Sequence, residues 1–228
     1  MAIRVIKRHH DFLLLGERRQ FSLSVSCAEG LRCYNETAEL PEPDTELYAA
    51  FATARSEKAL VVAITKLLEA YRLKRRPAFG AEQFAPILLP ELERIRQHSG
   101  DANPNELTSI DRVIGSFNEL RLRFTDQLSR RKELLREVTL SKLLHFIRPE
   151  CYWIVDSRIK ALSFIWGYSE SFRGFGELLK DLFRNRKFPQ LSSFLRVEER
   201  AFTAGRPFLH GNTPLLKLID KILWSRAD

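Results

Sequence analysis

The stretch TLSKLLHFIRPECYWIVDSRIKAL, residues 139–162, carries the most specific pattern in the chain. Its first half has apolar residues at helical spacing, and Pro149 starts the connection that follows, because proline cannot continue helical hydrogen bonding. The apolar residues 151–155 predict a short extended piece. Asp156 then has the side chain that accepts hydrogen bonds from free amides at a helix start. The stretch therefore predicts a helix, a connection and a second helix that begins at Asp156.

The chain from residue 45 onward is dominated by helical periods. Ser56 is expected to cap a helix that reaches Tyr71 and ends in the basic run at residues 72–76. Ser109 is expected to cap another helix with apolar residues at 110, 113, 114 and 117. Further helices are expected over 90–97, 120–135, 140–147, 158–167, 176–183, 191–201 and 214–224. The predicted fold class is mainly α.

Residues 1–44 have a different pattern. The segment 20–27 alternates apolar and polar side chains, and residues 31–34 are expected to return after the turn-prone Glu29-Gly30, which predicts a β-hairpin. Pro41, Pro43 and Asp44 predict a break. We therefore expect an N-terminal β-hairpin segment over 1–44 and a helical domain over 45–228.

Composition excludes several classes of protein. The chain has 228 residues, 44% of them hydrophobic, and a net charge of +8, which suits a polyanionic partner and equally suits a solvated surface. The apolar run at 12–15 is too short for a signal peptide or a membrane span, so we expect no membrane association. The three cysteines have no disulfide or zinc spacing, and we predict a cytoplasmic protein without metal or cofactor.

Basic residues surround the specific stretch. Arg158 and Lys160 fall in the first turn of the second predicted helix, where the helix dipole disfavours cations, so a carboxylate or a phosphate is expected nearby. Arg148 is a further candidate contact to phosphate. The same applies to three cations in the preceding helix: Arg130, Arg131 and Lys132. Each of these side chains has a solvated surface as its alternative role.

The order of residues in this stretch resembles the active-site segment of the helix-hairpin-helix DNA glycosylases. Shared features are a lysine, an amphipathic helix, a proline, apolar strand-like residues, and an aspartate followed by small, basic and β-branched residues. The chain looks even more like a group of uncharacterised bacterial proteins that are divergent relatives of that superfamily. Their phrases are similar to Ser141–Leu144, Pro149, Asp156 and the C-terminal Leu216–Trp224, over roughly 85 residues.

The resemblance implies a multi-helix glycosylase-like core and a protein that binds duplex DNA and excises a damaged or modified base, with or without strand cleavage. Asp156 then corresponds to the carboxylate that stabilises the sugar cation or activates a nucleophile. Lys142 corresponds to the amine that attacks the sugar to form an imine. Tyr152 and Trp153 are candidates to stack on the extruded base, and His145 is a supporting candidate.

Each of these residues also has a structural interpretation. Asp156 is explained equally by helix capping, Lys142 by a solvated helix surface, and the histidine and aromatic residues by core packing. The family's hairpin usually carries glycines, whereas residues 136–140 contain none. This departure favours two alternatives to the enzyme: a non-catalytic DNA-binding module on the same scaffold, and a helical protein-interaction subunit.

Overall fold

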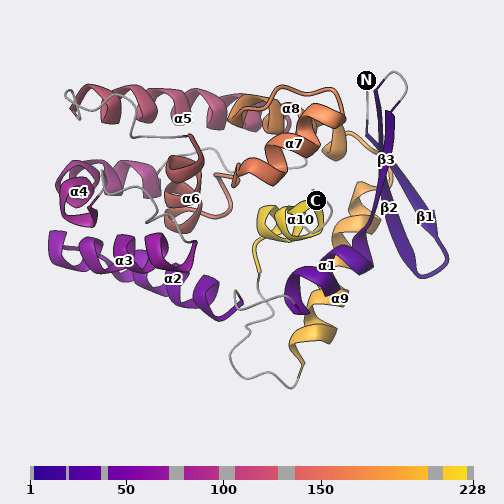
Figure 1. The fold of residues 1–228 in the computed structure, drawn as a ribbon, viewed down its shortest axis with the longest axis horizontal. Coiled ribbons are helices and arrows are strands. Elements are labelled where there is room, and N and C mark those ends of the chain that lie inside the picture. Colours follow the sequence, from indigo (N-terminus) through magenta and orange to yellow (C-terminus); the bar gives the residue numbers. More distant parts are fainter. Residues whose placement is uncertain are drawn as a thin grey trace.

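The computed structural model describes residues 3–18, 21–36, 41–71, 80–97, 106–127, 137–204 and 213–224. The described residues form ten helices and a small three-stranded antiparallel sheet near the N-terminus (Figure 1). The prediction of a mainly helical protein is confirmed. Among the described residues, no helix has the length and hydropathy needed to span a membrane.

The sheet consists of β1 (Arg4–Arg8), β2 (Asp11–Arg18) and β3 (Phe21–Ser26), in that order. Its register places Val5 opposite Leu14 and Leu14 opposite Val25. All three side chains are almost fully buried. Since alternate residues of a strand point to opposite faces, this row forms the face of the sheet that packs into the protein.

The predicted hairpin has the wrong second strand. β3 matches the expected strand, but it pairs with β2, and residues 31–34 lie in α1 (Cys27–Glu36). Asp11 Oδ1 accepts a hydrogen bond from Ala28 N at 2.9 Å, and Ser26 Oγ accepts one from Glu29 N at 3.1 Å. These bonds satisfy free amides at the helix start, so the chain enters a helix where a β-turn was expected.

Five helices form the first group: α2 (Pro41–Thr53), α3 (Glu57–Ala70), α4 (Ala81–Gln97), α5 (Thr108–Gln127) and α6 (Glu137–Ile147). α3 packs on α2 and α4, and α6 packs on α2, α4 and α5. Ser56 caps α3 as predicted, because its side chain accepts from Ala59 N. The central position of α6 explains why all its residues from 140 to 147 are buried.

Three predicted boundaries in this group are wrong. The break expected at residues 41–44 is the first turn of α2, where proline is tolerated because its missing N–H has no helical partner. The helix expected from Pro90 begins at Ala81 and contains two prolines. α5 begins at Thr108, so Ser109 lies inside it, fully buried.

The second group comprises the sheet, α1 and four later helices: α7 (Ser157–Ile165), α8 (Phe172–Phe183), α9 (Phe188–Thr203) and α10 (Leu215–Trp224). α10 packs against α1, α7, α9 and β3, and α7 also contacts β2, β3 and α8. Figure 1 shows α10 between the first group and the sheet, with α5 and α8 along one side. The proposed boundary at residue 44 stays a prediction, and the basic run at 72–76 lies outside the described residues.

Gly16 in β2 allows an indole ring to lie directly on the strand. A Cβ atom at this position would overlap the ring of Trp166, with Cδ2 only 2.7 Å away. Trp166 is 1% exposed, and its Nε1 donates to Leu23 O at 3.2 Å. Leu23 is the residue of β3 that lies opposite Gly16 in the sheet. The absence of a side chain at Gly16 is therefore what permits α7 to dock on the sheet.

We expect Gly16→Ala to reduce the free energy of unfolding by about 1–3 kcal/mol, because the added methyl group overpacks this contact. Gly115→Ala is the matched control, since a Cβ there meets no atom within 4 Å. That substitution should stabilise α5 by about 0.5–1 kcal/mol. Equal effects of the two substitutions in denaturant unfolding would contradict the contact.

Candidate functional site

Hydrogen bonds to one serine hold α6 next to the start of α7. Ser141 Oγ accepts from Val155 N at 3.1 Å and lies 3.3 Å from Val155 O and 3.0 Å from Val138 O. Ser141 precedes Lys142, and Val155 precedes Asp156. The two residues predicted to act together are therefore brought to adjacent positions on two neighbouring segments.

Asp156 is the N-cap of α7, as predicted. Its backbone is extended, and its Oδ1 accepts from Ile159 N at 3.0 Å. The side chain is half-buried. Oδ1 is used for capping, and Oδ2 of the same carboxylate is not needed for it. The capping role is therefore compatible with a second role of Asp156 in catalysis.

Lys142 is buried, in contrast to the solvated lysine of the alternative interpretation. The residue is 6% exposed, and its Nζ lies 4.2 Å from the centroid of the Tyr71 ring. Within the described part of the chain, this ring is the only hydrogen-bonding, ionic or aromatic contact of the amine. Burial lowers the pKa of Lys142, and the nearby carboxylates of Asp156 and Asp220 only partly offset this effect.

A buried ionic network lies beside Lys142 and joins the two helical groups. Lys217 of α10 is 1% exposed, and its Nζ lies 3.0 Å from Asp220 Oδ2 and 3.4 Å from Asp44 Oδ2. It also donates to Tyr71 Oη at 3.3 Å, while Tyr71 Oη donates to Asp44 Oδ1 at 2.7 Å. The Tyr34 hydroxyl lies 3.5 Å from Asp44 Oδ2. This Lys217 network connects α1, α2, α3 and α10.

The network shifts the pKa values of Lys217 and Asp220 for different reasons. Burial opposes the charged form of Lys217, but Asp44, Tyr34, Tyr71 and Asp220 outweigh it and raise the pKa of this lysine well above its ordinary value. Burial raises the pKa of Asp220 more than Lys217 lowers it, and neighbouring Asp156 adds to the increase. Asp220 Oδ1 is buried with no hydrogen-bond partner among the described residues. That oxygen is available to a donor from a ligand or from water.

A second buried network holds the other side of α10. Lys221 Nζ lies 2.5 Å from Glu199 Oε1 of α9 and donates to Asn35 Oδ1 of α1 at 3.0 Å. Asn35 Nδ2 donates to Glu199 Oε2 at 2.8 Å, and Thr213 Oγ1 donates to Glu199 Oε1 at 2.9 Å. Both carboxylate oxygens are satisfied, which is the condition under which a buried ion pair is tolerated.

His145 belongs to the interior and not to an exposed binding surface. Its Nδ1 lies 2.7 Å from Tyr152 O and its Nε2 lies 2.7 Å from Tyr48 Oη. Burial lowers the pKa of His145 to about 3, so the ring is neutral. Because a carbonyl oxygen only accepts, Nδ1 carries the proton and Nε2 accepts from the Tyr48 hydroxyl.

Tyr152 and Trp153, the residues predicted to stack on a base, lie in the core of the structure. Both side chains are 0% exposed. Trp153 Nε1 donates to Phe172 O at 3.0 Å, and the two rings are stacked with centroids 4.3 Å apart. Tyr152 Oη lies 2.7 Å from Ser116 Oγ. These aromatic residues hold the connection between α6 and α7 in the core, and their base-stacking role stays a prediction.

The basic residues predicted to contact DNA are engaged within the protein. Lys160 Nζ lies 2.9 Å from Glu137 Oε2, which supplies the expected carboxylate. The Arg158 guanidinium lies 4.0 Å from the centroid of a Trp224 ring. Arg148 donates to Arg96 O at 3.1 Å. The three remaining candidates, Arg130, Arg131 and Lys132, lie outside the described residues.

Sequence reasoning assigned no role in a functional site to Lys217, Asp220 or Asp44. A signal was present in α10, where Lys217, Asp220 and Lys221 share the spacing of one helix face in an otherwise apolar helix. Charged residues in such a helix indicate buried ion pairs. Their partners were not predictable, because Asp44 and Glu199 come from distant parts of the sequence.

We expect His145 to make the protein sensitive to acid. Between pH 6.5 and about 3, the unfolded chain takes up a proton at this residue and the folded protein does not. Stability contributed by neutral His145 is therefore complete above pH 6.5 and falls as the pH decreases, by about 1.4 kcal/mol for each pH unit.

The His145→Asn variant removes this titration and keeps an N–H that can reach Tyr152 O. Its free energy of unfolding should be lower at pH 7 and should depend less on pH between 6.5 and 4 than that of the unmodified protein. Parallel pH profiles in urea unfolding would show that His145 is accessible to protons in the folded state.

Comparison with known proteins does not assign the chain to a group: no family model matches it, and neither a curated protein nor a solved structure is detectably similar to it.

Proposed function

We propose that this protein binds DNA and acts as a DNA glycosylase with lyase activity, using Lys142 as the nucleophile and Asp156 as its carboxylate partner. The observation that carries the proposal is the buried amine of Lys142, which has no ion pair within the described part of the chain and lies beside the capping carboxylate. Imine formation requires a neutral amine, and burial favours that form.

The proposed reaction follows from these two groups. Lys142 Nζ forms a bond to the anomeric carbon of the sugar while the bond from that carbon to the base breaks, and the base leaves with the electron pair. The amine loses a proton, for which the Asp156 carboxylate at the start of α7 is the proposed acceptor. The bond from the anomeric carbon to the ring oxygen then breaks, the ring oxygen takes up the proton held by Asp156, and the open sugar remains joined to Lys142 as a protonated imine. Asp220 Oδ1 is a second candidate acceptor, because it has no hydrogen-bond partner among the described residues and Asp220 interacts electrostatically with the same amine.

The second candidate is a non-catalytic DNA-binding module. It is favoured by the limited exposure of Lys142, 6%, and by the aromatic residues at 152 and 153 that are fixed in the core. In that case Lys142 and Asp156 stabilise the junction of α6 and α7 and do not react. The two candidates differ in one measurable product, the covalent adduct between the lysine and DNA.

Borohydride trapping on duplexes that carry modified bases or abasic sites tests the enzyme. We expect the unmodified protein to form a covalent adduct and Lys142→Met to form none, since methionine fills the buried space without an amine. Asp156→Asn should reduce the adduct rate by about 100-fold or more while the helix cap is retained, because asparagine also caps helices.

Lys66→Met is the matched control, since Lys66 is an exposed lysine on α3 that pairs with Glu46. It should trap as well as the unmodified protein. Salt-sensitive DNA binding without any adduct across the substrate panel would support the non-catalytic module instead. Absence of both binding and adduct would contradict both candidates.

A further inference from the structure

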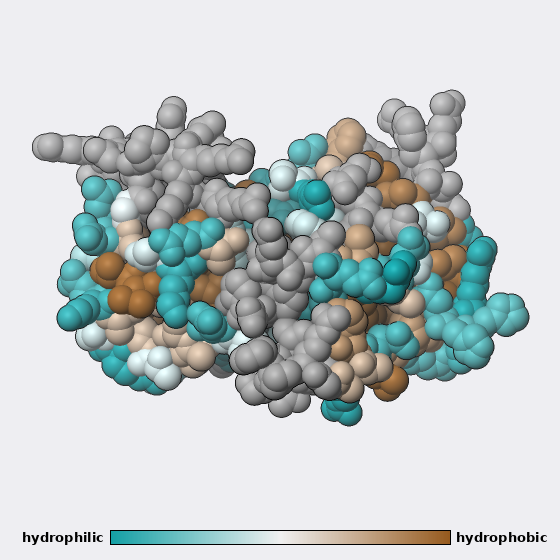
Figure 2. Space-filling view, turned by 60° about the horizontal axis from the view of Figure 1, so that its bottom comes forward, coloured by the Kyte–Doolittle hydropathy of each residue, from teal (hydrophilic) through white to brown (hydrophobic). Residues whose placement is uncertain are grey.

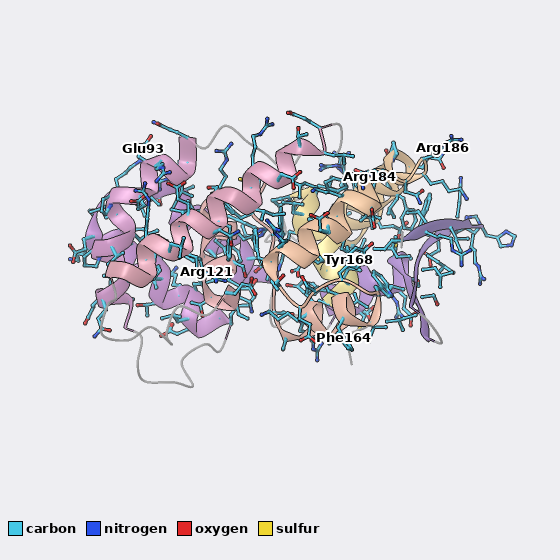
Figure 3. All side chains as sticks on the ribbon, turned by 90° about the horizontal axis from the view of Figure 1, so that it is seen from above. Glu93, Arg121, Phe164, Tyr168, Arg184 and Arg186 are labelled. Carbon is cyan, nitrogen blue, oxygen red and sulfur yellow. The ribbon has the colours of Figure 1, made fainter. Side chains whose placement is uncertain are left out.

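Basic residues gather on a surface that the sequence did not single out. Six exposed cations lie on β1 and on the turn between α8 and α9: Arg4, Lys7, Arg8, Arg184, Arg186 and Lys187. Figure 3 labels two of them, Arg184 and Arg186, at the end of the molecule that carries the sheet. On the face in Figure 2, hydrophilic side chains also project from that end. We call these six residues the cationic strip.

Two contacts place the sheet against the α8–α9 turn and the middle of α9. Asn185 Nδ2 donates to Ile3 O at 3.4 Å, which places Arg4 next to the α8–α9 turn. At the other end, the rings of Phe12 and Phe194 lie 5.3 Å apart. β1 is about 16 Å long, at about 3.3 Å per residue, and carries Arg4 and Arg8 on one face and Lys7 on the face that it shares with Val5. That length matches roughly five phosphates along one DNA strand at about 3.4 Å each.

The strip has little negative charge of its own. Asp11 accepts from Phe12 N, Ser26 Oγ and Ala28 N, and so is committed to the start of α1. Asp181 accepts from Tyr168 Oη at 2.6 Å and lies 3.4 Å from Arg184. No ion pair involving Lys7, Arg8, Arg186 or Lys187 is found within the described part of the chain.

Several exposed cations on α4 and α5 are matched by carboxylates, in contrast to four of those in the strip. On α4 and α5, Arg94 pairs with Glu91 and Glu119, and Arg123 pairs with the same two carboxylates. Arg112 pairs with Glu106 at 2.6 Å. Lys7, Arg8, Arg186 and Lys187 have no such pairing within the described part of the chain, and unpaired like charges on one surface are the electrostatic pattern of a site that binds a polyanion.

We propose that the cationic strip binds the phosphate backbone of DNA outside the Lys142 site, an inference that rests on the proposed function for the identity of the polymer. Asp156 lies at the start of α7, and Trp166 at its far end contacts the sheet. Since α7 has nine residues, the sheet lies about 14 Å from Asp156 along the helix. The strip thus binds DNA about four or more base pairs away from the reacting base.

The test measures how DNA affinity depends on salt, with a duplex of about 20 base pairs that carries one abasic site. The strip variant combines Lys7→Gln, Arg8→Gln, Arg186→Gln and Lys187→Gln. Its slope of log affinity against log salt should decrease by about 0.9 for each lost phosphate contact, and affinity at low salt should fall at least about tenfold. The control variant removes the same charge elsewhere, through Lys58→Gln, Lys66→Gln, Arg112→Gln and Arg173→Gln, and should keep both values.

Equal salt slopes for the strip variant and the control variant would overturn the proposal that the strip binds DNA. Absence of DNA binding by the unmodified protein would overturn it as well. Loss of binding to vesicles of anionic phospholipid, without any effect on DNA, would assign the strip to a membrane surface and overturn the proposal as well. Lys142→Met separates this inference from the chemistry. If Lys142→Met forms no adduct but keeps the full salt slope, DNA binding by the strip is supported independently of the chemistry. If the unmodified protein shows the same slope but never forms an adduct, only the proposed enzymatic activity is contradicted.

Discussion

The fold depends on the buried charges of α10. Lys217 connects Asp44 of α2, Tyr71 at the end of α3 and Asp220 of its own helix, while Lys221 connects Glu199 of α9 and Asn35 of α1. Removing one member of such a network leaves an uncompensated charge in the interior, at a cost of about 3–5 kcal/mol. An apolar helix at this position would bury as much surface but would not select these partners. The ion pairs thus fix which side of α10 meets each helical group.

The same charges determine the chemistry available at α6. Lys217 takes both nearby carboxylates, Asp44 and Asp220, and its positive charge further disfavours a second cation at Lys142. Lys142 is left with an aromatic ring and the capping carboxylate of Asp156 as its surroundings. These surroundings favour the neutral amine that the proposed nucleophilic role of Lys142 requires. The cationic strip on β1 lies away from this site, so the parts proposed to hold DNA and to react with it are carried by different elements.

Local features of the sequence predicted local features of the structure. Asp156 and Ser56 were identified as helix caps because capping depends on a few neighbouring residues, and both accept the expected amide hydrogen bond. The partner of β3 was predicted wrongly because strand pairing is a choice among distant segments, and the apolar run in β2 was the better match. The Lys217 network was not predicted at all: Lys217 and Tyr71 are 146 positions apart, and no local pattern joins them. Tyr152 and Trp153 show the converse, since their residue types fit a base-binding site and only the packing of α8 shows that they belong to the core.

The most direct test of this account is an NMR titration of the Lys142 side-chain amine in the intact protein, with the signal assigned by its absence in Lys142→Arg. The account predicts a midpoint clearly below the value of about 10.4 for an ordinary lysine, because the amine is buried next to the positive charge of Lys217. A midpoint at or above the ordinary value would mean that Lys142 is solvated or firmly ion-paired. The site described here would then hold a structural cation and no nucleophile.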